Sequence, residues 1–145
     1  MPPPRNERLR RDEIGRRDAL GAYRFDPAEA DAFADRFDPL ALAASSDGTR
    51  IVSPWHVAAA FMPLNVAFQA RASVLQFGPS PGVSDLVWHR PVLQGETLHY
   101  SQTATAKRRT ARLAGWGLLT TQVEARDEAD ELVFSMIGRV LVRTD

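Results

Sequence analysis

The sequence contains no cysteine, no net charge and no long hydrophobic run, and each absence excludes a class of function. Without cysteine there are no disulfides, no thiolate nucleophile and no Cys-based zinc site. Eighteen Lys and Arg balance eighteen Asp and Glu, so no overall field attracts nucleic acid or an anionic membrane. No apolar run reaches the roughly 18 residues of a membrane span, and the N-terminus lacks the apolar core of a signal peptide. We therefore expect a cytoplasmic protein that binds neither nucleic acid nor membrane.

Histidine is also scarce, and its spacing excludes a further class of site. His56, His89 and His99 are the only histidines and show no paired ligand spacing. The sequence also contains no P-loop, no dinucleotide-binding fingerprint and no G-x-S-x-G elbow. We expect neither a metal site nor a cofactor.

What is present suits one globular domain. The chain has 145 residues, of which 44% are hydrophobic, enough for a single core. Residues 1–18 combine three consecutive prolines with mixed charges, a composition that predicts a mobile arm. The alternative is that this Arg-rich arm lies on a partner subunit or an acidic ligand. Residues 19–145 form the predicted domain.

The first half of this domain predicts a short strand and two helices. A strand is expected over residues 19–25. Asp26 as N-cap, Pro27 in the first turn and Glu29 three residues after the cap predict a helix, whose Phe33 and Phe37 should pack on the core. Ser53 is the natural N-cap of a second helix with Pro54 in its first turn, "WHVAAAFMPLNVAFQA", which is apolar on nearly every face and should be buried on all sides. Pro63 should kink or end this helix.

The second half predicts strands. After the turn "FGPSPG", four runs rich in β-branched and aromatic residues are joined by three short connections that suit antiparallel hairpins. With the first strand, these runs predict an α+β fold, in which a curled antiparallel sheet of about five strands wraps around one long buried helix.

Three segments resemble the MaoC-like hotdog family. "SPGVSDLVWHRPVLQGETL", residues 80–98, is similar to the family's Pro-Gly-Val turn, Leu-x-Trp strand, Arg-Pro-Val and Gly-Asp/Glu-Thr-Leu. "YRFDPAEADAFADRFDP" resembles its opening strand and helix, and "SPWHVAAAFM" its Ser-Gly-Trp-His-x-Ala-Ala helix start. The resemblance covers residues 19–143. It implies a hotdog fold, homodimers and acyl-CoA thioester ligands, with hydration of enoyl-CoA or the reverse dehydration in active members.

The resemblance also implies a catalytic arrangement that this sequence does not complete. Active members use an Asp, a His five residues later and a backbone N–H of a Gly at the start of the buried helix. These positions fall on Asp38, Ala43 and Pro54. Alanine cannot exchange a proton, and proline has no N–H for a developing oxyanion. The sequence therefore predicts a remodelled site.

Several residues are candidates for this site, and each has a structural alternative. Ser53 could be only a helix cap, His56 a satisfied core histidine, His89 a solvent-facing residue and the basic hairpin a solvated tip. Our candidates are Asp38 and His56 for catalysis; Ser53, Trp55 and His89 for substrate binding; and Lys107, Arg108, Arg109 and Arg112 for the phosphates of coenzyme A.

Three functions fit these observations. The first is a MaoC-like acyl-CoA hydratase or dehydratase relative with a divergent site. The second is a non-catalytic acyl-CoA-binding or partner subunit, in which another hotdog chain supplies the missing groups. The third is a hotdog thioesterase that uses Asp38 to activate water. We expect a homodimer, with a higher oligomer or a heterodimer with a complete hotdog chain as alternatives.

Overall fold

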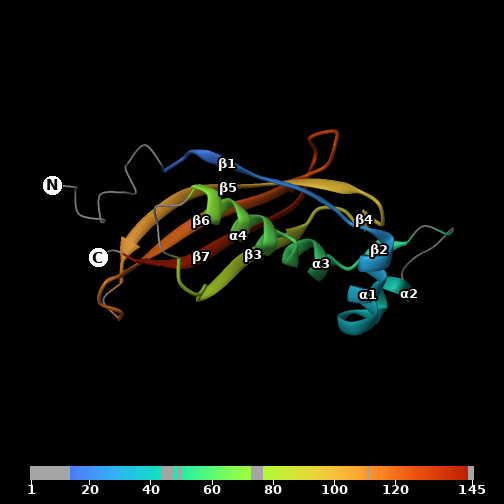
Figure 1. Cartoon of the computed structure of the whole chain (residues 1–145), viewed down its shortest axis with the longest axis horizontal. Helices are drawn as coiled ribbons and strands as arrows, with labels where there is room; N and C mark the ends of the chain where they lie inside the picture. Colours follow the sequence, from blue (N-terminus) through green and yellow to red (C-terminus); the bar gives the residue numbers. More distant parts are fainter. Residues whose placement is uncertain (1–13, 44–47, 49, 73–76, 111, 144–145) are drawn as a thin grey trace.

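The computed structural model describes residues 14–43, 48, 50–72, 77–110 and 112–143, and its largest element is an antiparallel sheet (Figure 1). Five strands lie in the order β1-β5-β6-β7-β3. Their bounds are β1 Arg17–Arg24, β3 Gly82–Trp88, β5 Thr97–Arg109, β6 Trp116–Arg126 and β7 Leu132–Arg143. The predicted α+β architecture with a sheet of about five strands is confirmed.

The central strands form because their side chains alternate between the two faces of the sheet. In β6 every second residue from Gly117 to Ala125 is buried. On the core face Val123 lies opposite Met136 of β7, and Ala125 lies opposite Phe134. The core also contains Phe25, Leu98, Tyr100 and Val133, all 2% exposed or less. Burial of this apolar surface is the main force that holds the sheet against the helices.

Two consecutive helices, α3 (Pro54–Ala59) and α4 (Phe61–Ala72), lie across one face of the sheet (Figure 1). The interruption falls at Ala60, three residues before Pro63. Because Pro63 has no N–H and its ring would clash with the carbonyl of Ala59, the chain cannot continue one regular helix through this point. Pro63 then stands in the first turn of α4, where a missing N–H removes no helical hydrogen bond.

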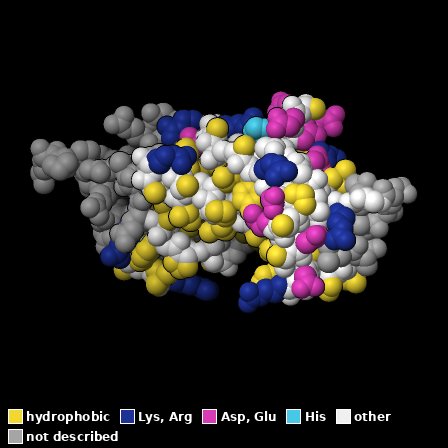
Figure 2. All heavy atoms as spheres, turned by 45° about the vertical axis from the view of Figure 1, so that its right-hand side comes forward, with side chains coloured by type: hydrophobic (Ala, Val, Ile, Leu, Met, Phe, Trp, Pro, Cys, Tyr) yellow, Lys and Arg dark blue, Asp and Glu magenta, His cyan; other side chains and the backbone are white. Residues whose placement is uncertain are grey.

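The expectation that this helical segment is buried on all sides was wrong for the single chain. Phe61, Leu64 and Phe68 pack on the core, but Met62 is 53% exposed and Val66 60% exposed. The sheet covers only one side of α4. Figure 2 shows hydrophobic side chains gathered over the middle of the face that carries α3 and α4.

Helix α1 (Pro27–Phe37) begins as predicted. The side chain of Asp26 accepts a hydrogen bond from the backbone N–H of Glu29 at 3.2 Å. Phe33 packs inward, stacked on the ring of His56. The prediction for Phe37 was wrong, because Phe37 is 64% exposed. Here Phe37 lies at the end of the helix, under the guanidinium of Arg36 at 5.1 Å.

The remaining elements gather beside α1 at one end of the sheet. They are α2 (Pro39–Ala43) and the short strands β2 (Ile51–Val52) and β4 (Val92–Leu93), which pair with each other (Figure 1). At the N-terminus, β1 begins two residues before the predicted domain start. The rest of the predicted arm, up to residue 13, lies outside the described residues. No helix in the described part of the chain is long and apolar enough to cross a membrane.

One close approach yields a stability prediction. A Cβ added at Gly78 would lie 2.6 Å from Trp116, whose ring also lies under the guanidinium of Arg143 at 5.0 Å. We expect Gly78→Ala to displace the indole and to lower the free energy of unfolding by about 1–3 kcal/mol in urea titrations. Gly82→Ala is the matched control, because nothing lies within 4 Å of its added Cβ. Equal stability of the two variants would contradict this account.

Candidate functional site

A pocket of about 490 Å³ opens where α1, α2, β2, the start of α3 and the segment after β3 meet. Its volume is typical of a small-molecule site. The wall is mainly apolar, with Asp38 as its carboxylate. Its lining residues are Asp38, Leu40, Ala41, Ile51, Val52, Pro54, Val57, Trp88, His89, Arg90, Pro91 and Val92.

Asp38 is held in this wall by Ser53. The hydroxyl of Ser53 donates a hydrogen bond to Oδ2 of Asp38 at 2.7 Å, and Ser53 is fully buried. Asp38 follows α1, where its backbone N–H donates to the carbonyl of Ala34 at 2.9 Å. Ser53 is the N-cap residue of α3, as predicted, but its side chain makes no capping hydrogen bond and turns to Asp38 instead. The pair joins the end of α1 to the start of α3.

Pro54 has no backbone N–H, and its carbonyl faces Trp88. The indole N–H of Trp88 donates to this carbonyl at 2.8 Å. Trp88 also packs on Phe134 of the core and meets the ring of Trp55 edge-on at 5.0 Å. The start of α3 is thereby fixed on the sheet, but Pro54 supplies no donor to the pocket.

His56 lies outside the residues that line the pocket. Its side chain is 5% exposed, stacks on Phe33 at 4.6 Å and 9°, and meets Phe25 edge-on at 5.1 Å. Nε2 lies 3.4 Å from Oε1 of Glu29, which also accepts a hydrogen bond from the hydroxyl of Tyr23. Nδ1 is buried, and no described residue is its hydrogen-bond partner. His56 and Asp38 therefore do not line the pocket together.

The surroundings of His56 and Tyr23 change how both groups titrate. Burial lowers the pKa of His56 below 6.5, and the nearby carboxylate of Glu29 opposes this only in part. Burial, together with the hydrogen bond to Glu29, raises the pKa of Tyr23 to about 12. At neutral pH both side chains are therefore uncharged.

Solved structures of other proteins are similar to this chain over most of its length. The MaoC-like dehydratase from Rhodospirillum rubrum is similar over 91% of this chain and 93% of that chain, at 24% identity and a TM-score of 0.73. The (R)-hydratase from A. caviae is similar over 88% and 95%, at 26% identity and 0.60. A conserved Mycobacterium tuberculosis protein with a double hotdog fold is similar over 91% of this chain and 42% of its own, at 18% identity and 0.70.

The chain has the hotdog fold. It shares this fold with MaoC-like dehydratases and (R)-hydratases, as the resemblance implied. No protein-family model and no curated protein matches the sequence.

Of the residues predicted to bind substrate, His89 lines the pocket and Trp55 lies next to a residue that lines it. Trp55 is 58% exposed and reaches the pocket only through its contact with Trp88. His89 borders the pocket, but its Nε2 lies 3.0 Å from Oγ of Ser135. Because Trp88 pairs with Phe134 on the core face, alternation places His89 and Ser135 on the opposite face. Both roles stay predictions.

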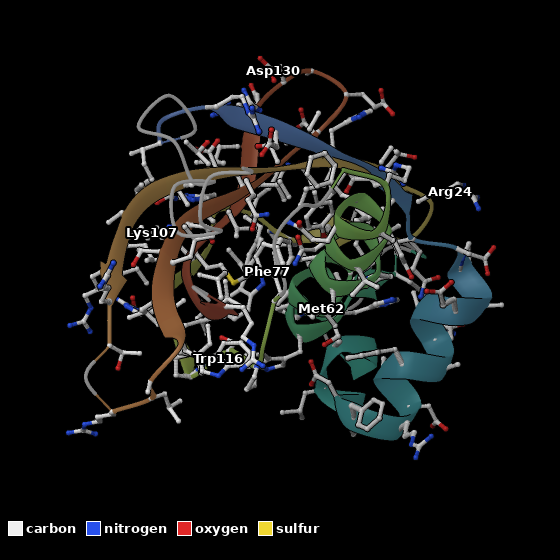
Figure 3. The ribbon with its side chains drawn as sticks, turned by 60° about the vertical axis from the view of Figure 1, so that its left-hand side comes forward. Arg24, Met62, Phe77, Lys107, Trp116 and Asp130 are labelled. Carbon is white, nitrogen blue, oxygen red and sulfur yellow. The ribbon has the colours of Figure 1, made fainter. Side chains whose placement is uncertain are left out.

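The basic hairpin between β5 and β6 lies at the opposite end of the hotdog sheet from α1 and α2 (Figure 1). Figure 3 shows Lys107 and Trp116 on the side of the molecule away from these helices. The thirteen residues of β5 span roughly 40 Å along the strand. The hairpin of the same chain, with its Arg108, Arg109 and Arg112, therefore does not border the pocket.

Arg90 was not among the site residues predicted from the sequence, although it helps to form the pocket wall. Its guanidinium bonds Oε1 and Oε2 of Glu96 at 2.8 and 3.1 Å and Oδ2 of Asp127 at 2.9 Å. Burial raises the pKa of Glu96, but hydrogen bonds from Arg90 and from the N–H of Leu93 bring it below its usual value. Arg and Glu on either side of the "PVLQG" turn are the signal in the sequence, but Asp127 is distant and gives none.

The described residues contain no group of three His, Cys, Asp or Glu that could hold a metal ion. Asp38 offers hydrogen bonding and proton transfer in this pocket.

The buried imidazole predicts a pH-dependent stability. Because the pKa of His56 is lower in the folded state than the unfolded value of 6.5, the unfolded state binds more protons as the pH falls below 6.5. We expect the free energy of unfolding to fall between pH 7.5 and 5, by at most about 1.4 kcal/mol per pH unit from this residue. Urea titrations at both pH values measure the change.

The control is His56→Phe, which keeps an aromatic ring without the titrating group. The loss of stability between pH 7.5 and 5 should be smaller in this variant. An identical loss in both proteins would show that other groups cause it.

Proposed function

We propose that the chain binds an acyl-CoA thioester in this pocket, as a relative of the MaoC-like hydratases and dehydratases with an altered site. The observation that carries the proposal is the carboxylate of Asp38, aligned by the hydroxyl of Ser53 in a mainly apolar pocket of about 490 Å³. A thioester end and the first carbons of an acyl chain suit such a wall. The similarity to an (R)-hydratase at 26% identity supports the same class of reaction.

The chemistry of the site follows from what Asp38 can do. One carboxylate oxygen accepts from Ser53, and the other oxygen is free of that bond to accept a proton from water. Addition of water also needs a proton for the α-carbon and a donor for the thioester oxygen. Ala43 has no proton to give, and Pro54 has no N–H. The chain alone should therefore hydrate an enoyl thioester slowly.

The assay for this proposal is hydration of a panel of trans-2-enoyl-CoAs by the purified protein, followed by loss of the conjugated thioester absorbance. We expect slow turnover that Asp38→Asn abolishes and that Ser53→Ala lowers about 10-fold, because the carboxylate loses its alignment. Asp35→Asn, on the exposed side of α1, is the matched control and should retain the wild-type rate.

Two results would contradict hydration by Asp38. One is full turnover in Asp38→Asn. The other is release of free thiol from saturated acyl-CoA without hydration of any enoyl-CoA, which would favour a thioesterase.

A second candidate function, a binding or partner subunit, is favoured by the exposed apolar stripe on α3 and α4. The stripe consists of Trp55, Ala59, Met62 and Val66, at helical spacings of 4, 3 and 4. The edge strand β3 adds the exposed Val83. Such an apolar surface beside a free sheet edge suits another hotdog domain, and the Mycobacterium tuberculosis relative carries two.

A dimer of this kind would also bring the basic hairpin near the pocket. In an antiparallel pair, the basic hairpin of one protomer would approach the pocket end of the other. Lys107, Arg108, Arg109 and Arg112 would then contact coenzyme A phosphates from the second protomer.

We expect a dimer by light scattering at about 10 μM, and a monomer for Val66→Asp, because a charge in the stripe opposes its burial. Ala22→Asp is the matched control, since Ala22 is exposed on β1, at the opposite edge of the sheet from β3. A wild-type monomer would contradict the homodimer. A dimer retained in Val66→Asp would place the interface elsewhere.

A further inference from the structure

The two ends of the Asp38–Ser53 hydrogen bond come from different helices, and the chain between them does not explain their meeting. Asp38 directly follows α1, Ser53 directly precedes α3, and fourteen residues separate them. Such a connection permits many separations of its ends. The 2.7 Å distance therefore depends on contacts that hold α1 against this segment: the ion pair of Arg50 with Asp31 at 2.9 Å, just before β2, and the packing of α1 against α3.

His56 makes the described side-chain contacts between these two helices, apart from the Asp38–Ser53 bond itself. It stands in the first turn of α3, three residues after Ser53. From there its ring stacks on Phe33 of α1 at 4.6 Å and 9°, and Nε2 approaches Glu29 of α1 at 3.4 Å. On its edges it meets Phe25, which follows β1, and Tyr23, the last residue but one of β1. The imidazole thus lies at the junction of α1, α3 and β1.

His56 contacts α1 and β1 mainly with the faces and edges of its ring, and less with its ring nitrogens. Nδ1 has no hydrogen-bond partner among the described residues, and 3.4 Å is long for a hydrogen bond from Nε2. A buried imidazole with a proton-transfer role would need a nitrogen directed at the substrate, and His56 does not line the pocket.

We propose that His56 is a positioning residue, whose buried ring holds α1 on α3 and thereby sets Asp38 against Ser53 at the pocket. The role assigned to His56 thus changes from proton transfer to alignment of Asp38. The inference rests on the proposed function only where turnover or thioester binding is measured.

The first test needs no substrate. In a double-mutant cycle, the loss in free energy of unfolding caused by Ser53→Ala is measured in wild type, His56→Ala, His56→Phe and Tyr100→Phe. We expect this loss to be largely absent in His56→Ala, because the Asp38–Ser53 bond is already disrupted there, and unchanged in His56→Phe. Tyr100→Phe is the control: it removes a buried 2.6 Å hydrogen bond to Val57 of α3 and keeps the aromatic ring in the core, so the loss should equal that in wild type.

The second test separates positioning from proton transfer. If wild type hydrates or binds enoyl-CoA, His56→Phe should stay close to wild type, and His56→Ala should fall about 10- to 100-fold, as a misplaced carboxylate predicts. Phe33→Leu, which removes the stacked ring from α1, should show the same loss and replaces His56→Ala if that variant does not fold.

Two outcomes overturn the inference. One is an equal cost of Ser53→Ala in His56→Ala and wild type. The other is a loss of turnover in His56→Phe as large as in His56→Ala, which would show that a ring nitrogen is required. If wild type neither binds nor hydrates thioesters, the proposed function fails, and the cycle still decides the role of His56.

Discussion

The need to cover one apolar face of an antiparallel sheet determines most of this structure. Strands β5, β6 and β7 present a continuous apolar face, and α3 with α4 covers it. Because α3 begins at the end of the sheet beside Trp88, its first residues stand where β2, β4 and α2 gather. The pocket is thus a consequence of where the covering helix starts.

The same start of α3 decides what chemistry the pocket can support. A residue with an N–H at position 54 would present a donor at the first turn, whereas Pro54 presents only a carbonyl, which Trp88 occupies. Ser53 instead directs its hydroxyl to Asp38. The pocket therefore contains a carboxylate whose bonded side-chain partner is a neutral hydroxyl.

Local signals in the sequence predicted those features that depend on neighbours along the chain. Asp26 and Glu29 predicted the start of α1, and alternation predicted β6, because caps and strand faces depend on nearby residues. The predictions that Phe37 and all sides of α4 are buried were wrong. Periodicity shows which residues share a helix face, but not how much of that face the sheet covers. The partner of Ser53 and the bonds of Arg90 to Glu96 and Asp127 join distant segments, which no spacing rule connects.

The ion pairs of Arg90 also affect which ligands suit the pocket. Its guanidinium is neutralised by two carboxylates, so it offers little charge to an anion in the pocket. Asp38 stands in the same wall with a hydroxyl, not a cation, as its bonded partner. A thioester carbonyl is uncharged and can approach this carboxylate, whereas a free fatty acid would bring a second negative charge beside it. A carboxylate ligand would therefore lie beside Asp38 in this wall, near a guanidinium that already pairs with Glu96 and Asp127.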